Sequence, residues 1–223
     1  MRSVVLLSGG LDSAVALAWA SRRGEVLLAV TFDYGQRAAR RETAAARKIA
    51  QAFGAPHKCV RLDWLGTITD TALVNRRRAV PNPNAGDLDS KSTEDAARAV
   101  WVPNRNAVFV CVAAAFAEAL GADTVVAGFN AEEGATFPDN RPAFVRTMNR
   151  VLKISTLRGV RLVAPTQRLT KVGIVSLGRR LGVPLEHTWS CYLGGREPCG
   201  RCESCLRFAR AVRQAGRPGR TQR

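Results

Sequence analysis

The sequence lacks the features that would place a protein in a membrane or outside the cell. No apolar run approaches the roughly 18 residues that a membrane-spanning helix needs. The short apolar run in MRSVVLLSGG is followed by no small-residue cleavage site, so it predicts a first strand and not a signal peptide. The sequence therefore predicts a cytoplasmic protein with no membrane partner.

Acidic residues are scarce, with 18 Asp and Glu against 34 Lys and Arg, for a formal charge of +16. An excess of this sign attracts the phosphates of nucleic acids. The basic residues are nevertheless spread along the chain and become dense only after Cys205. A solvated, arginine-rich surface explains this pattern, so the charge allows non-specific RNA affinity and requires no direct nucleic-acid binding.

The 223 residues, 46% of them apolar, are enough for one sizeable core. Short β-branched runs alternate with helical patterns, which predicts an α/β fold with a parallel sheet and helices on both faces. Strands are expected at Ser3–Leu7, Val26–Phe32, Lys58–Leu62, Thr124–Ala127 and Val160–Val163. Helices are expected at Asp12–Arg22, Ala38–Phe53, Asn106–Leu120, Ala143–Leu152 and Lys171–Leu181, stopped by Gly24, Gly54, Gly121 and Gly182.

This pattern divides the chain into three parts. Residues 1–185 are predicted to form the α/β domain, residues 186–210 a small cysteine-rich module with a helix, and residues 211–223 a disordered basic tail. The segment 66–103 fits none of the periodic patterns, because it is long, polar and rich in Arg, Asn and Pro. Such a segment predicts a lid, a binding loop or a mobile excursion.

A glycine-rich string follows the first predicted strand and opens a helix. In Ser8-Gly9-Gly10-Leu11-Asp12-Ser13, glycine permits close backbone approach, the two hydroxyls add donors, and the aspartate can hold Mg²⁺. Turn sterics would explain a lone Gly-Gly pair, but the whole string is more specific. It is neither a Walker loop, which needs G-K-[ST], nor the dinucleotide pattern G-x-G-x-x-G.

The string resembles the pyrophosphatase loop of the adenine-nucleotide α-hydrolase-like superfamily, which has a Rossmann-like fold. The resemblance implies that ATP is cleaved between its α- and β-phosphates. The loop would hold the leaving pyrophosphate while a substrate oxygen attacks the α-phosphorus. The ATP-binding residues would be Ser8, Gly9, Gly10, Leu11, Asp12 and Ser13.

Four of the six cysteines lie close together near the C-terminus. The spacing Cys191-x7-Cys199-x2-Cys202-x2-Cys205 brings four thiolates within reach of one tetrahedral Zn²⁺. An iron–sulfur cluster or redox-active C-x-x-C pairs would use the same thiolates, and both alternatives stay open. The other two cysteines, Cys59 and Cys111, lie in apolar stretches and are expected to be inert core thiols.

The loop and the cysteines together resemble the 7-cyano-7-deazaguanine synthase family over nearly the whole chain. The other matching segments are DYGQR at 33–37, VPNRN at 102–106, LTK at 169–171 and WSCY at 189–192. The family makes the nitrile base that precedes queuosine and archaeosine in tRNA. The chain departs from the common bacterial pattern at Ala38, which follows YGQR, and at Asn140, where that pattern has cysteine. The segment GFNAEEGATFPDN resembles an archaeal-type branch of the family more closely.

The resemblance also suggests residue roles. Asp12 and Lys171 would be catalytic, the lysine by neutralising phosphate charge; a solvated lysine at a helix start is the alternative. Asp139 and either Glu132 or Glu133 would accept hydrogen bonds from the amino and ring N–H groups of the substrate, unless they belong to a polar surface loop. Arg105 would bind the substrate carboxylate or only cap its loop.

The chemistry implied by the family has two rounds. ATP adenylates a deazapurine carboxylate, ammonia displaces AMP to give the amide, and a second ATP activates the amide oxygen before AMP leaves and the nitrile forms. Because the chain has no glutaminase domain and no obvious Cys-His pair, free ammonia is the expected nitrogen donor. ATP, Mg²⁺ and Zn²⁺ are the expected cofactors, and a homodimer is the expected assembly.

Two other functions remain compatible with the sequence. One is a tRNA-modifying enzyme of the same superfamily, either a thiolase or a lysidine-type ligase, which the arginine content favours slightly. The other is a zinc-containing nucleic-acid-binding module with no enzymatic activity, which would bind RNA or DNA with a steep dependence on salt.

Overall fold

The fold is built on one parallel sheet. The computed structural model describes residues 1–84, 86, 88 and 97–216. The strands are β1 (Arg2–Leu6), β2 (Glu25–Asp33), β3 (His57–Arg61), β4 (Thr124–Val126) and β5 (Arg161–Val163). They lie in the order β3-β2-β1-β4-β5, and every neighbouring pair is parallel.

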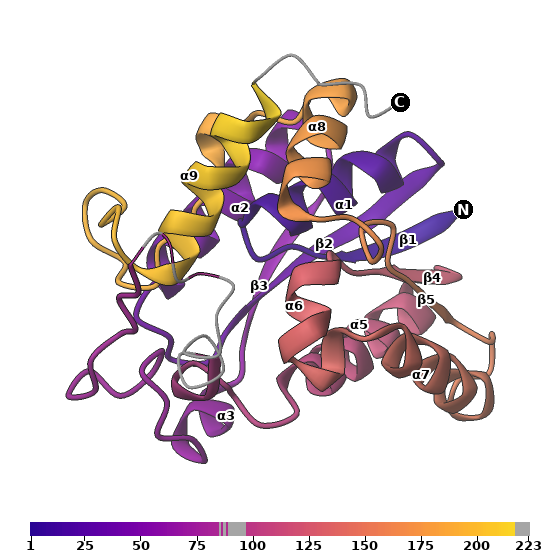
Figure 1. Ribbon diagram of the computed structural model, residues 1–223. Coiled ribbons are helices and arrows are strands. Elements are labelled where there is room, and N and C mark those ends of the chain that lie inside the picture. The colour runs from indigo at the N-terminus through magenta and orange to yellow at the C-terminus, as the bar shows by residue number, and fades with distance from the viewer. Residues whose placement is uncertain (85, 87, 89–96, 217–223) are drawn as a thin grey trace.

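Helices cover both faces of this sheet (Figure 1). The α-helices are α1 (Leu11–Ser21), α2 (Ala39–Ala52), α3 (Asp63–Thr67), α5 (Arg105–Leu120), α6 (Ala131–Thr136), α7 (Pro142–Ser155), α8 (Lys171–Leu181) and α9 (Glu203–Ala215). Two short 3-10 helices are η2 (Pro138–Asn140) and η3 (Leu185–His187). Within the described ranges, no helix is long and apolar enough to cross a membrane.

The core consists of two apolar clusters, one on each face of the sheet. Successive side chains of a strand point to opposite faces, so the fully buried neighbours Val4 and Val5 of β1 belong to different clusters. Val4 packs in the cluster that includes α5 and α7, whereas Val5 packs in the cluster that includes α1, α2 and α8. A strand buried on both faces reads as a continuous apolar run, which explains VVLL after Ser3.

The direction of chain progression reverses between β1 and β4. From β1 the chain moves to β2 and β3 on one side, and it later returns to β4 and β5 on the other. The connections that leave the carboxyl ends of β1 and β4 therefore diverge. A crevice opens at such a point in doubly wound sheets, and ligands bind there.

The structure confirms the predicted architecture. All five predicted strands and all five predicted helices are present, with bounds that differ by a few residues. The four glycines predicted to stop helices all have positive φ. The helix α6 was missed because AEEGAT has no apolar periodicity and buries no residue; the side chain of Asn130 starts it by accepting a hydrogen bond from Glu133 N at 2.9 Å.

Two expectations were wrong. Residues 211–215, predicted to belong to a disordered tail, are helical, because α9 continues to Ala215 and buries Ala211 against the core around α8; residues 217–223 lie outside the described part. Cys59 and Cys111 are exposed and not core thiols. Cys59 lies on the sheet-edge strand β3, and Cys111 on the outward side of α5, so an apolar neighbourhood in sequence did not mean burial.

We predict that Leu17→Ala lowers the free energy of unfolding by about 2–5 kcal/mol, because it leaves a cavity beneath α1 where the side chain is 0% exposed. Leu157→Ala is the matched control, since that side chain is 100% exposed and its loss leaves no cavity. Denaturant unfolding followed by circular dichroism measures both variants. Equal midpoints for the two would contradict the assignment of the core.

Candidate active site

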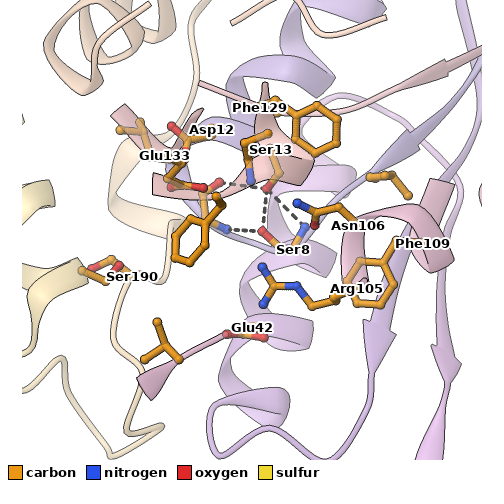
Figure 2. Close-up of a pocket in the computed structure, with 18 of the residues that line it drawn as sticks. Ser8, Asp12, Ser13, Glu42, Arg105, Asn106, Phe109, Phe129, Glu133 and Ser190 are labelled. Atoms are coloured by element: carbon orange, nitrogen blue, oxygen red, sulfur yellow. Dashed lines mark hydrogen bonds between the residues drawn. The ribbon is translucent and has the colours of Figure 1, made fainter. Parts of the chain in front are cut away.

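A cavity of about 300 Å³ lies at the crevice between the carboxyl ends of β1 and β4. Its volume is within the range of small-molecule sites. The walls come from segments far apart in the chain: the loop after β1, the segment after β2, the start of α5, the α6–η2 region, and the cysteine-rich segment with α9. Figure 2 shows side chains from several of these elements directed into one space.

The floor of the cavity is the glycine loop, which we define as residues 8–13. The hydroxyl of Ser13 donates to Gly10 O at 3.0 Å and accepts from Ser8 N at 3.1 Å. The two serine hydroxyls lie 3.1 Å apart, and Gly10 N donates to Ser8 Oγ at 3.4 Å. The loop leads into α1, whose first-turn N–H groups have no side-chain cap and form a positive helix end.

Gly9 and Gly128 allow close packing around this loop. Gly9 has φ +81°, and a Cβ there would lie 2.5 Å from the carbonyl oxygen of Glu42 on α2. A Cβ on Gly128, just after β4, would lie 2.6 Å from the carbonyl carbon of Asp12. The sequence predicted that the glycines let the backbone approach phosphates closely. At Gly9 the close approach is instead to α2, and Gly9 does not line the cavity.

The cysteine segment, residues 188–202, holds the loop from the other side. Trp189 N donates to Gly9 O at 2.9 Å, and the indole Nε1 donates to Cys191 O at 2.8 Å. In a trans peptide the C=O and the following N–H point in opposite directions. The bond to Gly9 O therefore turns the Gly10 N–H away from Trp189 and toward Ser8, whose side chain lines the cavity.

Lys171 joins two carboxylates at one end of the cavity. Its ammonium group makes ion pairs with Asp12 and, at 2.7 Å, with Glu133. Only 13% of the Lys171 side chain is exposed, so the alternative of a solvated lysine is wrong. α8 presents this residue at its first position, where Glu132 Oε1 accepts from Lys171 N at 2.7 Å.

The electrostatics of this cluster suit a site for a cation. Burial raises the pKa of Asp12 to about 6, against the opposing effect of Lys171. Burial also acts to raise the pKa of Glu133, but Lys171 holds it below the usual value. The second oxygen of Asp12, Oδ1, is buried and has no hydrogen-bond partner. A buried carboxylate oxygen without a hydrogen-bond partner destabilises the folded state, and a Mg²⁺ ion bound to this oxygen would offset that cost.

Arg105 and Asp139 occupy the opposite part of the cavity. Arg105 begins α5 and donates from Nη1 to the hydroxyl of Tyr34 at 3.2 Å. Asp139 is 7% exposed and accepts from Asn106 N at 3.3 Å, and burial raises its pKa. The alternative of a polar surface loop is therefore wrong for Asp139. Arg105 also lines the cavity, and Figure 2 shows its guanidinium group directed into this space.

The structure separates the two glutamates that the sequence left as alternatives. Glu133 lines the cavity. Glu132 does not, because its carboxylate accepts from the backbone of Lys171 and lies 3.4 Å from Arg207 and 3.5 Å from Arg210 of α9. Glu132 therefore connects α6, α8 and α9 and has no access to a ligand in the cavity.

Several cavity residues were missed by the sequence reasoning. After β2 these residues are Tyr34, Gln36 and Glu42, and before α5 they include Trp101. From the cysteine segment and α9 they include Tyr192, Glu203, Ser204, Arg207 and Phe208. In the sequence, the DYGQR segment contributed only to the family resemblance. Its place at the carboxyl end of a strand next to β1 was the available signal. Nothing in the α9 sequence indicated that this helix would reach the site.

The polar segment 66–103 contributes to the same cavity. Leu73, Val100, Trp101 and Val102 line it, and Trp101 stacks on Phe137 with ring centroids 5.6 Å apart. Arg37, in the DYGQR segment, donates to the carbonyl oxygens of Asn75 and Arg78 and so anchors this segment. These contacts support a binding loop; residues 85, 87 and 89–96 lie outside the described part.

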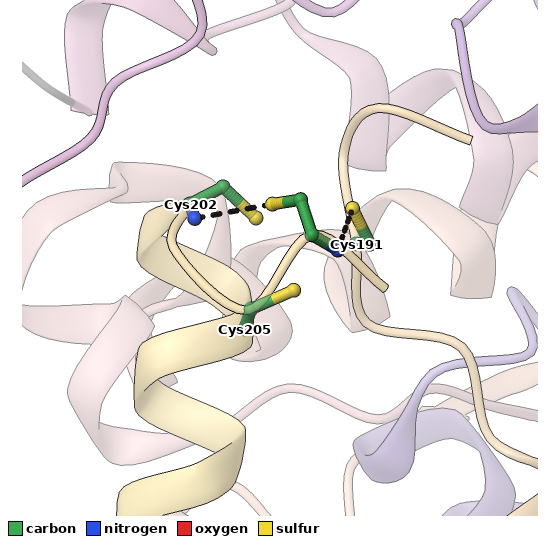
Figure 3. Close-up of side chains that lie close together, drawn as sticks. Cys191, Cys202 and Cys205 are labelled. Atoms are coloured by element: carbon green, nitrogen blue, oxygen red, sulfur yellow. Dashed lines mark hydrogen bonds between the residues drawn. The ribbon is translucent and has the colours of Figure 1, made fainter. Parts of the chain in front are cut away.

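The four cysteines of the cluster converge on one point. Their sulfur atoms all lie within 4.8 Å of one another, and Figure 3 shows those of Cys191, Cys202 and Cys205 facing a common space. A tetrahedral Zn²⁺ with Zn–S bonds of about 2.3 Å needs sulfur atoms about 3.8 Å apart, so the residues fit this metal after a small contraction. Backbone N–H groups of Leu193 and Cys199 donate to the sulfur of Cys191 at 3.4 Å, which would stabilise a thiolate.

Comparison with known proteins identifies close relatives over the full length. The family described as "Queuosine biosynthesis protein QueC" matches residues 2–216. A 7-cyano-7-deazaguanine synthase of Pelotomaculum thermopropionicum is 52% identical, over 97% of this chain and 98% of that protein. Proteins of the same name from Desulforudis audaxviator and Methanosarcina mazei are 51% and 47% identical, over 97% of this chain and 98% and 95% of their own lengths.

We predict that Gly9→Ala lowers the unfolding free energy by about 3 kcal/mol or more, because the residue has positive φ and its Cβ would collide with α2. Gly10→Ala is the matched control: φ is −81° and the nearest atom to its Cβ is 3.5 Å away, so stability is retained. Thermal unfolding compares the two variants. A Gly9→Ala protein as stable as Gly10→Ala would refute the packing described for the loop.

We predict that Trp189→Phe keeps its metal but weakens ATP binding by about tenfold, because it loses the Nε1 bond to Cys191 O that fixes Trp189, the residue whose backbone N–H binds the glycine loop at Gly9 O. Trp64→Phe, at a half-exposed position on α3, is the control. Calorimetry gives the ATP dissociation constant and metal analysis the zinc content. An unchanged ATP affinity with zinc retained would disprove the link between the two sites.

Proposed function

Since the chain belongs to the family of the queuosine biosynthesis protein QueC, we propose that it converts 7-carboxy-7-deazaguanine and ammonia to 7-cyano-7-deazaguanine at the expense of ATP. The observation that carries this function is the cavity at the β1–β4 crevice, where an uncapped helix N-terminus meets both a carboxylate cluster and an arginine. The helix N-terminus suits a triphosphate, and the arginine suits a carboxylate substrate.

In this proposal the glycine loop binds the β- and γ-phosphates of ATP. The N–H groups at the start of α1 and the hydroxyl of Ser8 supply the donors; the hydroxyl of Ser13 would join them by exchanging its bond to Gly10 O for one to a phosphate oxygen. The leaving pyrophosphate then stays on groups that are already in place, so little reorganisation is needed as charge develops. Leu11 is 5% exposed and contributes packing beneath the nucleotide.

Asp12 and Lys171 neutralise the charge of the phosphates. Asp12 would hold Mg²⁺ through the oxygen that lacks a partner, and the ion would shield the negative charge of the phosphate oxygens. Lys171 has three N–H donors, of which Asp12 and Glu133 occupy two. The third is available for a phosphate oxygen, so Lys171 binds nucleotide without breaking its ion pairs.

The substrate base occupies the Arg105–Asp139 side of the cavity. Arg105 binds the carboxylate and directs one of its oxygens at the α-phosphorus. Asp139 accepts hydrogen bonds from the amino and ring N–H groups, which are donors that carboxylates match; Glu133 lies at the other end of the cavity, beside Lys171. The stacked Trp101 and Phe137 rings offer a flat apolar surface for the bicyclic ring system of the substrate.

Each round converts a poor leaving group into a good one. The substrate carboxylate attacks ATP to form the acyl adenylate and pyrophosphate, and ammonia then displaces AMP to give the amide. In the second round the amide oxygen attacks a second ATP and releases pyrophosphate, and loss of AMP and of both amide protons leaves the nitrile. Zn²⁺ on the four cysteines would hold the cysteine segment against the glycine loop and take no part in these steps.

Further properties remain proposals from the family resemblance. We expect a homodimer in the cytoplasm, membership of the archaeal-type branch, and a product that serves queuosine or archaeosine synthesis. We also propose that the chain divides into an α/β domain and a zinc module.

The proposal predicts that the purified protein makes the nitrile from the carboxylate, ammonium and ATP, and that about two AMP and two pyrophosphate form per nitrile, because both rounds consume ATP. Asp12→Asn should lower kcat by about 100-fold or more, since the metal ligand is lost. Asp63→Asn, in an exposed ion pair with Arg61, is the control and should keep full activity. Mass spectrometry and nucleotide chromatography measure the products.

Two results would overturn the proposal. If ATP were consumed only in the presence of tRNA and the tRNA became modified, the superfamily alternative would be correct. If Asp12→Asn were fully active, the glycine loop would not bind the nucleotide.

A further inference from the structure

Glu42 is an acidic residue of the cavity that has no role in the proposed function. Glu42 lies in the first turn of α2, and its side chain lines the cavity near Arg105 (Figure 2). Its backbone carbonyl is the group against which Gly9 packs. Glu42 is therefore adjacent to the glycine loop and near Arg105, which binds the substrate carboxylate in the proposed function.

Gln36 fixes the Glu42 carboxylate in one orientation. Its amide nitrogen donates to Glu42 Oε2 at 2.8 Å and to Phe32 O at 3.0 Å. Its amide oxygen accepts from Tyr34 N at 2.9 Å. These three bonds fix the amide, which is 6% exposed, so that it can only donate to Glu42. Oε1 of Glu42 accepts no hydrogen bond from the described residues, and Glu42 lines the cavity.

Glu42 has no cationic partner within 4.0 Å among the residues that the structure describes. The charged and titratable groups nearest to it are Arg105, which donates to Tyr34, Tyr34 itself and Asp33. Burial raises the pKa of Glu42, although the bond from Gln36 and the charge of Arg105 oppose the shift. An ionised carboxylate held in a cavity without a cation is costly, so a cationic ligand would stabilise it.

The neighbours of Glu42 select the kind of cation. Mg²⁺ requires several oxygen ligands in octahedral geometry, but Gln36 presents an N–H to this carboxylate and no oxygen. The amino edge of the guanine-like base already has an acceptor in Asp139 in the proposed function. A small ion with N–H donors needs only one acceptor oxygen and fits the remaining Oε1.

We propose that Glu42 binds the ammonium ion that supplies the nitrogen of the product and takes a proton from it. The inference rests on the proposed function, which needs ammonia and assigns no residue to it. Amines are protonated at neutral pH, and ammonium has no lone pair with which to attack. Placing the base beside the acyl adenylate releases ammonia where it reacts.

One N–H bond of ammonium breaks, and its proton goes to Oε1 of Glu42. The freed nitrogen lone pair forms the C–N bond at the acyl carbon, the C–O bond to AMP breaks, and AMP leaves with that electron pair. The nitrogen loses a second proton to solvent, which leaves the amide, and Glu42 returns its proton to solvent before the next turnover.

The test separates adenylation from amination. Without ammonium, exchange of labelled pyrophosphate into ATP in the presence of the carboxylate reports adenylation alone. Glu42→Gln keeps the size of the side chain and an acceptor oxygen for Gln36, so exchange should continue at the wild-type rate. The kcat/KM for ammonium should fall by about 100-fold or more, with a raised KM. Glu42→Asp should recover part of this loss because it restores a carboxylate.

Glu25→Gln, at an exposed glutamate on β2, is the matched control and should leave both measurements unchanged. If Glu42→Gln lost exchange and amination together while its thermal unfolding matched the wild type, Glu42 would serve nucleotide or acid binding and the inference would be wrong. An unchanged kcat/KM for ammonium would also overturn it. Absence of exchange in the wild type would instead refute the proposed function.

Discussion

The central constraint in this structure is the confinement of the glycine loop. α2 packs against Gly9, the segment after β4 packs against Asp12 through Gly128, and Trp189 binds the Gly9 carbonyl. A loop held on these sides cannot rotate its peptides freely, so the N–H groups at the start of α1 keep one direction. Preorganised donors of this kind stabilise developing charge without a cost at the moment of reaction. The cysteine cluster, although separate in the sequence, belongs to this arrangement because it anchors Trp189.

The distribution of charge is the second organising feature. The chain has 34 basic and 18 acidic residues, yet five acidic residues line the cavity (Asp12, Glu42, Glu133, Asp139 and Glu203) against three basic ones (Arg105, Lys171 and Arg207). The scarce acids are therefore concentrated where a polyanion would bind. Such a site needs cations besides its own side chains, which agrees with a need for Mg²⁺ at Asp12 and ammonium at Glu42. The overall excess of arginine in the chain therefore does not account for the charge of this cavity.

Much of the fold could be predicted because it follows from local patterns. Apolar runs and helical spacing are repeated in the chain and locate each main strand and helix. Ser8–Ser13 and the four cysteines are short strings whose chemistry can be read without distant contacts. Glu42, Gln36 and the α9 residues could not be found this way, since their place in the site depends on which segments pack together. Cys59 and Cys111 were misjudged for the same reason: an apolar neighbourhood does not say which side of a helix or strand faces solvent.

The most direct test of the account follows one oxygen atom. If the glycine loop holds the β- and γ-phosphates, the substrate carboxylate attacks the α-phosphorus, and one of its oxygens passes to AMP when the amide forms. Substrate labelled with ¹⁸O in the carboxylate should therefore yield AMP that contains ¹⁸O, which phosphorus NMR detects by its isotope shift. Label found in inorganic phosphate, with ADP as the nucleotide product, would mean attack at the γ-phosphorus and would contradict the account.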